Sequence, residues 1–138
     1  MNQNPIQYRV IIAGTRTFND YNLLKESCEY LLRESMEKHQ IIIVSGQAKG
    51  ADTMGERFAK EHGLPCEYYP ANWQIHGRAA GPIRNKEMAN NADALIAFWD
   101  GQSRGTLSMI NLARKMGLQV AICRYDKLKQ TKEQETDS

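Results

Sequence analysis

The 138-residue chain is 41% hydrophobic and 25% charged, and this length and composition are those of a single globular domain. Its formal net charge of +2 does not favour nucleic acid or an acidic membrane as a bulk partner. The sequence shows no signal peptide, no apolar run of membrane-spanning length and no metal-ligand spacing among its three cysteines, so we expect a cytoplasmic protein with reduced thiols and no membrane contact.

Short apolar runs alternate with helical stretches along the chain. The expected strands cover residues 8–13, 41–44, 66–69, 94–99 and 119–123. The expected helices cover residues 21–39, 51–62, 83–92 and 105–116. This alternation predicts an α/β fold, a single-domain Rossmann-like three-layer sandwich with a mostly parallel sheet of about five strands. We assign residues 1–7 to an N-terminal extension, residues 8–124 to the domain, and residues 125–138 to a polar C-terminal tail that is expected to be disordered.

Two helix ends share one sequence pattern. Gly63-Leu64 and Gly117-Leu118 each close a helix and lead into a strand, and glycine favours the left-handed residue that ends a helix. We therefore expect the same turn at both places. In the last helix, Leu107, Ile110, Ala113 and Met116 are expected to lie on a shared flank.

A long connection over residues 70–82 follows the third expected strand. Loops of this length are uncommon in compact α/β domains and tend to be functional. Tyr69, Trp73 and His76 belong to this region. Their rings are suited either to stacking on a base or to anchoring the loop, and the sequence leaves both interpretations open.

Parallel strands bring the loops that follow them to one edge of the sheet. Segments 14–20, 46–52, 70–82 and 100–106 are therefore expected to meet there. These segments, and the helix turns that open from them, carry five cations: Arg16, Lys49, Arg78, Arg84 and Arg104. Five cations beside several helix N-termini predict an anion-binding crevice.

Two turns rich in small residues lead into helices at this edge and suit phosphate groups. The first contains Ser45, Gly46, Gln47, Gly50, Ala51 and Asp52. It lacks the GK[ST] ending of a Walker A loop, so ATP hydrolysis is not expected. The second contains Ser103, Gly105 and Thr106. Asp100 precedes it and is expected either to accept hydrogen bonds from ribose hydroxyls or to cap the turn at Gly101.

Four motifs together resemble a known family: Gly14-Thr15-Arg16, Ser45-Gly46-x-Ala48-x-Gly50-Ala51-Asp52, Gly81-Pro82-x-Arg84-Asn85 and Asp100-Gly101-x-Ser103-x-Gly105-Thr106. From about Tyr8 to Cys123 the chain resembles the YspA-like domain of the SLOG superfamily, the Rossmann-like group that includes DprA/Smf and the LOG proteins. The resemblance implies a nucleotide or nucleotide-derived ligand at the carboxyl edge of the sheet.

The resemblance to LOG proteins concerns the chemistry of a possible reaction. LOG proteins release a base from a nucleoside monophosphate with an arginine in a helix opening and the glutamate of a PGGxGTxxE motif. Arg84 looks similar to that arginine, whereas Met109 stands at the glutamate position. A methionine side chain cannot donate a proton, which disfavours LOG-type hydrolysis. Glu87, one turn after Arg84, is the nearby acid that could substitute.

Three functional hypotheses follow. The first is a sensor or carrier that binds a nucleotide-derived small molecule without a cofactor or metal, and a homodimer is left open. The second is an enzyme that hydrolyses or transfers an N-glycosidic bond, with Asp100 or Glu87 as the acid. The third is a DprA-type binder of single-stranded nucleic acid, which the weak net charge disfavours. The expected ligand-binding residues are Gly14, Thr15, Arg16, Ser45, Gly46, Gln47, Gly50, Ala51, Asp52, Arg78, Gly81, Arg84, Asn85, Asp100, Ser103, Gly105 and Thr106.

Overall fold

The computed structural model describes residues 6–127, which contain one five-stranded sheet in the order β3-β2-β1-β4-β5. All its neighbouring strands are parallel. The strands are β1 (Ile6–Gly14), β2 (His39–Ser45), β3 (Cys66–Tyr68), β4 (Ala94–Trp99) and β5 (Gln119–Arg124). The helices are α1 (Tyr21–Lys38), α2 (Ala51–Glu61), α3 (Trp73–His76), the 3-10 helix η1 (Gly77–Ala79), α4 (Ala80–Asn90) and α5 (Arg104–Lys115). The predicted α/β class and the predicted number of strands are confirmed.

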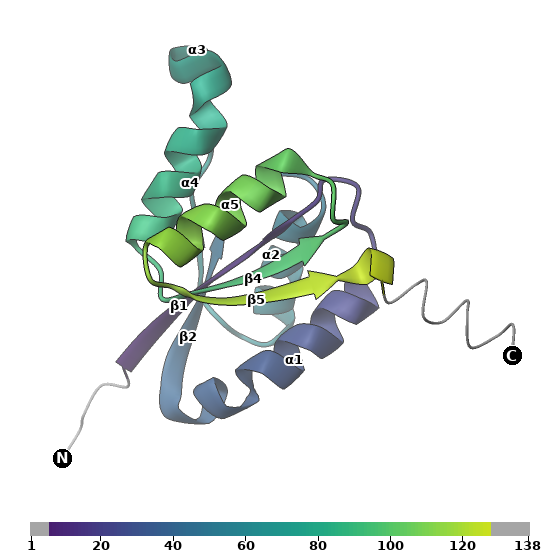
Figure 1. The fold of residues 1–138 in the computed structure, drawn as a ribbon. Coiled ribbons are helices and arrows are strands. Elements are labelled where there is room, and N and C mark those ends of the chain that lie inside the picture. Colours follow the sequence, from purple (N-terminus) through teal and green to yellow (C-terminus); the bar gives the residue numbers. More distant parts are fainter. Residues whose placement is uncertain (1–5, 128–138) are drawn as a thin grey trace, which may run out of the picture.

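Helices cover both faces of the sheet, α1 and α2 on one and α4 and α5 on the other (Figure 1). Side chains of β1 alternate between these faces, as strand geometry requires. Val10 and Ile12 pack in the core with Leu24 of α1, whereas Ile11 packs in the core with Ile110 of α5. Because β1 is the middle strand, its carboxyl end is flanked on both sides by the ends of other strands. The loop after β1 therefore lies at the centre of the edge at which the other loops meet.

The turns after α2 and α5 are closed in the same way. Gly63 and Gly117 adopt left-handed φ angles of 65° and 82°. The leucine N–H after each glycine donates to the carbonyl oxygen five residues earlier, at 2.8 Å for Leu64 and 3.0 Å for Leu118. These bonds satisfy carbonyl groups that the helix ends would leave unpaired. The predicted reuse of one turn is confirmed.

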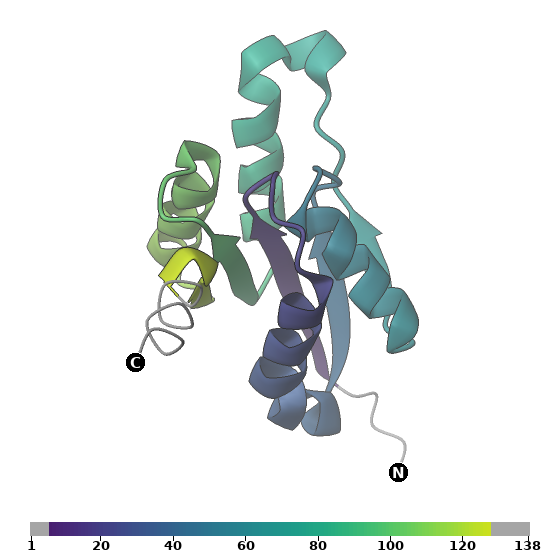
Figure 2. The same ribbon diagram turned by 90° about the vertical axis from the view of Figure 1, so that its right-hand side faces the viewer.

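Residues 70–82, expected as a long loop, are mostly helical. The side chain of Asn72 caps α3 by accepting the Ile75 N–H at 3.1 Å, and α4 begins at Ala80 rather than at residue 83. Together α3, η1 and the first turn of α4 form an arm that stands above the ends of the strands (Figure 2). The prediction of a loop was wrong because α3 buries none of its residues, so no apolar periodicity marked it as a helix.

The limits of the ordered domain differ slightly from the expected ones. Ile6 and Gln7 already pair with β2, so the first strand begins two residues before the expected start of the domain. At the other end, the Tyr125 ring packs against Phe18 with 4.8 Å between ring centroids. The rest of the expected N-terminal extension and C-terminal tail, residues 1–5 and 128–138, lies outside the described residues.

Three further expectations concern exposure. On the shared flank of α5, Ile110 and Ala113 are buried, whereas Leu107 is 38% exposed. The three cysteines are free thiols, of which Cys28 alone is fully buried. Among residues 6–127, no helix is both long enough and apolar enough to cross a membrane.

Candidate functional site

A cavity of about 720 Å³, here called the main cavity, lies at the carboxyl edge of the sheet between the loops and the helices α4 and α5. Ten of the expected ligand-binding residues line it: Gly14, Thr15, Arg16, Asp52, Gly81, Arg84, Asn85, Ser103, Gly105 and Thr106. A second hollow of about 540 Å³, the side hollow, shares Arg16, Ala48, Trp73 and Arg84 with the main cavity. It adds Gly46 and Gln47 from the same set of expected residues. The fold therefore brings residues from all four sequence motifs into one composite site.

The five expected cations do not all meet at this site. Arg16, Lys49 and Arg84 line one or both hollows. Arg78 of η1 and Arg104 of α5 are exposed and line neither. Lys86 of α4, which was not among the expected cations, also lines the main cavity. The positive charge of the composite site therefore differs in its members from the predicted set, and it comes from three segments of the chain.

Arg84 is held at the main cavity by its neighbours. Its Nη1 donates to the carbonyl oxygen of Gly46, and its Nε donates to Asn85 Oδ1 at 2.9 Å. Burial lowers the pKa of Arg84, while the Asp52 carboxylate raises it and the nearby Arg16 lowers it. Two guanidinium groups that repel each other and face one cavity favour an anion bound beside them.

Asp52 is the one carboxylic acid among the described residues that line the main cavity. It lies in the first turn of α2 and is only 4% exposed. Its Oδ2 accepts the Ala48 N–H at 3.3 Å. Burial raises the pKa of Asp52 to about 6, although backbone hydrogen bonds and Arg84 act in the opposite direction. The carboxyl group therefore keeps its proton at pH values where a solvated aspartate is ionised.

The turn after β2 is stabilised by its own polar contacts. Ser45 is fully buried, and its Oγ donates to Glu56 Oε2 at 2.6 Å and accepts the Gln47 N–H at 3.0 Å. Gly50 has a φ of 86°, and a Cβ there would collide with carbonyl oxygens of the loop after β1. Ser45, Gly50 and the buried Ala51 line neither hollow. These three residues shape the site instead of facing a ligand in it.

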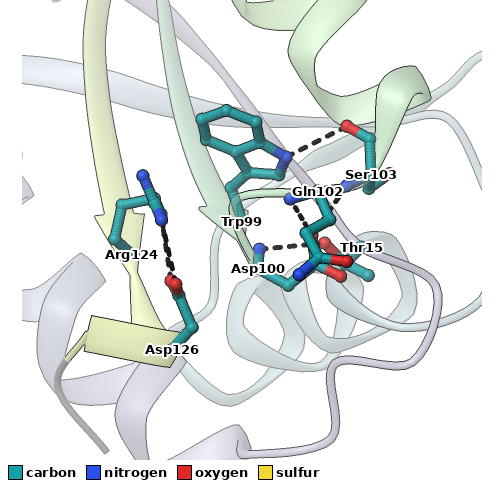
Figure 3. Close-up of polar contacts among 7 residues, drawn as sticks. All are labelled: Thr15, Trp99, Asp100, Gln102, Ser103, Arg124 and Asp126. Carbon is teal, nitrogen blue, oxygen red and sulfur yellow. Dashed lines mark hydrogen bonds and ion pairs between the residues drawn. The ribbon is translucent and has the colours of Figure 1, made fainter. Parts of the chain in front are cut away.

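Asp100 stabilises the turn that leads into α5, as Figure 3 shows. Its Oδ1 accepts the N–H groups of Gln102 at 2.9 Å and Ser103 at 2.8 Å, and its own N–H donates to Thr15 Oγ1 at 3.3 Å. These backbone N–H donors lower the pKa of Asp100. The residue does not line the main cavity. Of the two interpretations left open by the sequence, the geometry corresponds to the cap of the turn.

The same turn is covered from outside by an aromatic side chain and an ion pair. The indole Nε1 of Trp99 donates to the carbonyl oxygen of Ser103 at 3.0 Å, and the Arg124 guanidinium lies 5.0 Å from the centre of the Trp99 ring (Figure 3). Arg124 in turn pairs with Asp126 at 2.9 Å. These contacts fix the turn from which Ser103 and Gly105 reach the main cavity.

An apolar wall of the main cavity was not anticipated from the sequence. It consists of Pro82 and Met88 on α4 and of Met109 and Leu112 on α5. The three-residue spacing from Thr106 to Met109 to Leu112 is a signal that could have placed these side chains on the flank facing the cavity. Met109, which stands at the LOG glutamate position, thus faces the site but carries no acid.

The remaining side chains of interest lie outside the main cavity or at its rim. Trp73 lines both hollows and is 52% exposed, whereas His76 lines neither and Tyr69 packs against the core under α4 and α5. Glu87 is exposed and does not line the main cavity. Within residues 6–127, no three His, Cys, Asp or Glu side chains gather where they could hold a metal ion.

Comparison with known proteins agrees with these motifs. The family described as "YspA, cpYpsA-related SLOG family" matches residues 8–76. The Gene 61 protein of Mycobacterium phage D29 is 34% identical over 118 residues, which cover 81% of this chain and 93% of the phage protein. The chain belongs to the YspA, cpYpsA-related SLOG family. The similarity to the phage protein extends beyond the residues that the family model matches, because it covers nearly the whole phage chain.

A solved structure shares the fold of this chain. DNA processing protein A (DprA) from Streptococcus pneumoniae superposes with a TM-score of 0.63 at 18% sequence identity. The match covers 85% of this SLOG chain but only 50% of the DprA chain, so this chain spans about half the length of that protein. At this identity the likeness shows a shared Rossmann-like fold, as the sequence predicted.

Proposed function

We propose that this SLOG protein binds a nucleotide or nucleotide-derived small molecule at the carboxyl edge of its sheet, as a cytoplasmic sensor or carrier. The observation that carries the proposal is that Arg16 and Arg84 lie near each other on one cavity that is also lined by apolar side chains. A nucleotide has the same division, with a phosphate at one end and a flat base at the other. The volume of about 720 Å³ lies within the range typical of small-molecule sites.

The start of α5 supports the phosphate end of this proposal. Ser103 caps the helix by accepting the Thr106 N–H, and both residues line the main cavity with Gly105. A Cβ built on Gly105 would meet no atom within 4 Å, so the backbone there is open to an approaching group. A helix of this length presents its N–H groups and positive dipole end to an anion. The cations and the helix terminus therefore act on the same bound group.

A thermal-shift screen tests the proposal. The panel contains nucleoside mono-, di- and triphosphates, cyclic dinucleotides and ADP-ribose. A ligand present at a hundred times its Kd stabilises the folded protein by about 2.7 kcal/mol, which raises the Tm by several degrees. If no member of the panel raises the Tm of the protein, the proposal fails.

Two matched variants distinguish binding at the main cavity from a nonspecific effect of positive charge. Arg16→Ala removes an exposed cation that lines the main cavity, and Arg104→Ala removes an exposed cation on the same edge that does not line it. We expect Arg16→Ala to reduce the ligand-induced shift and Arg104→Ala to leave it unchanged. If both variants reduced the ligand-induced shift in Tm equally, the ligand would be attracted only by the overall positive charge of this edge of the sheet.

A second candidate function, cleavage of an N-glycosidic bond, is favoured by Asp52 rather than by Asp100 or Glu87. Among the described residues of the main cavity, it is the one acid able to give a proton to a leaving base, and burial keeps the proton in place up to about pH 6. Release of free base from nucleoside monophosphates, followed by chromatography, tests this role. Activity that survives Asp52→Asn but not Asp100→Asn would exclude it.

A further inference from the structure

The main cavity has two parts of different chemistry. Arg16, Arg84 and the start of α5 form a polar mouth at the edge of the sheet. The same cavity is also lined by apolar side chains of α4 and α5, and we call this part the α4–α5 cleft. The side chains that line it are Pro82, Met88, Met109 and Leu112. Met88 and Met109 are buried beneath it at 1% and 3% exposure.

Few polar side chains lie near the α4–α5 cleft, and most of them either already make a hydrogen bond within the protein or are exposed to solvent. The amide oxygen of Asn85 already accepts a hydrogen bond from Arg84 Nε at 2.9 Å, which leaves its NH2 group as the one donor of this side chain that a ligand can meet. Lys86 and Ser108 line the cavity but are exposed to solvent at its rim. A ligand group inside the cleft therefore meets mainly carbon and sulfur, and thioethers pack well against aromatic rings.

The size of the main cavity also bears on what can occupy it. Its volume of about 720 Å³ leaves room for a bicyclic base together with a sugar and a phosphate. Trp73 also lines the cavity, and its ring lies near Gly81 at the start of α4.

We propose that the α4–α5 cleft is the base-binding half of the site, and that it takes a purine-sized planar group by apolar packing rather than by hydrogen bonds to the edge of the base. This inference rests on the proposed function, since the cleft is continuous with the mouth that would hold the phosphate. It identifies the ligand class as purine nucleotides that carry at least one phosphate. It also predicts tolerance of changes to the hydrogen-bonding edge of the purine.

The Kd values of three ligands, measured by calorimetry, distinguish the contribution of the mouth to binding from that of the cleft. Ribose 5-phosphate occupies only the mouth, and AMP adds the purine. In 1,N6-etheno-AMP the added ring blocks the hydrogen-bonding edge of the base while enlarging its apolar area. We expect AMP to bind at least about tenfold more tightly than ribose 5-phosphate, as burial of a nucleobase-sized apolar surface implies. Etheno-AMP is expected to bind at least as tightly as AMP.

Two leucines of α5 provide a matched pair of variants. Leu112 lines the cleft, whereas Leu107 is exposed and does not line the main cavity. Leu112→Gln should weaken AMP and etheno-AMP by roughly five- to tenfold and leave ribose 5-phosphate unchanged, since a polar amide replaces part of the apolar wall. Leu107→Gln should leave all three Kd values unchanged.

The outcomes distinguish this inference from the proposed function. Binding of ribose 5-phosphate as tightly as AMP would overturn the base-binding role of the cleft while leaving anion binding at the mouth intact. Loss of binding on passing from AMP to etheno-AMP would overturn recognition by packing, because it would show that the edge of the base is read. Failure of all three ligands, and of every other nucleotide, to bind would overturn the inference together with the proposed function.

Discussion

Asp52 and Arg84 both lie against the backbone of Gly46. A Cβ built on Gly46 would come within 2.8 Å of Asp52 Oδ2 and within 2.8 Å of Arg84 Nη1. The carboxylate is buried, and the guanidinium also donates to the Gly46 carbonyl oxygen. This arrangement ties the end of β2 to the start of α4, two segments that are far apart in the sequence. Two predictions follow from it.

Gly46→Ala should destabilise the protein and weaken the site. The added methyl group has to displace either the carboxylate or the guanidinium, and overpacking of this kind costs about 1–3 kcal/mol. The free energy of unfolding in urea measures this cost. Gly105→Ala is the control, because a Cβ there meets no atom within 4 Å and alanine favours the helix. Equal stabilities of the two variants would contradict the close packing at Gly46.

Asp52 should make the stability of the protein depend on pH. Burial raises its pKa to about 6 in the folded protein, against 3.8 for an ordinary aspartate. Between these values the folded state binds more protons than the unfolded state, so the free energy of unfolding falls as pH rises from about 4 to 6 and then levels off. In Asp52→Asn this component is absent. The difference in unfolding free energy between the variant and the wild type should therefore change by up to roughly 3 kcal/mol over that interval. Parallel pH profiles of the two proteins would refute the role of Asp52.

Asp100 should matter for the turn and not for the ribose. Its carboxylate accepts two backbone N–H groups, so Asp100→Ala should cost about 1–2 kcal/mol of stability, measured by urea unfolding. Asp100→Asn keeps one acceptor oxygen and should retain nucleotide binding. The ratio of the Kd values for AMP and 2′-deoxy-AMP should be the same in Asp100→Asn and in the wild type. A different ratio in the variant would indicate that Asp100 does contact the ribose hydroxyls.

The two repeated helix ends should respond alike to substitution. Gly63 and Gly117 have left-handed φ angles and no atom within 4 Å of a built Cβ, so the cost of alanine is one of backbone conformation alone. Gly63→Ala and Gly117→Ala should each lower the free energy of unfolding by about 1–2 kcal/mol. The turns lie on different faces of the sheet, so the double variant should lose the sum of the two. Thermal or urea unfolding of the three variants checks both statements.

The sequence predicted the succession of strands and helices along the chain because most of these elements bury a face and so carry a periodic pattern, but it did not predict the order of the strands in the sheet. It also placed the site at the carboxyl edge, since parallel topology alone brings Gly14, Gly46 and Gly105 together. The α3 helix was missed because none of its residues is buried. Asp100 remained ambiguous because a carboxylate that caps a turn and one that binds ribose occupy the same place in a sequence.

The apolar wall of the site was missed for another reason. Met88, Met109 and Leu112 follow the same helical spacing as core residues, and periodicity does not tell a side chain that fills the core from one that lines a cavity. That distinction depends on the distance between α4 and α5, which only the three-dimensional structure contains.

The arm above the strand ends bears on how a ligand could leave the site. Trp73, which lines both hollows, is carried by a helix that buries none of its residues, whereas β1 has side chains in both cores. We therefore expect the indole to move without disturbing the sheet. Substitutions in residues 73–79 should then change the rate at which a bound molecule dissociates without altering Arg16 or Arg84.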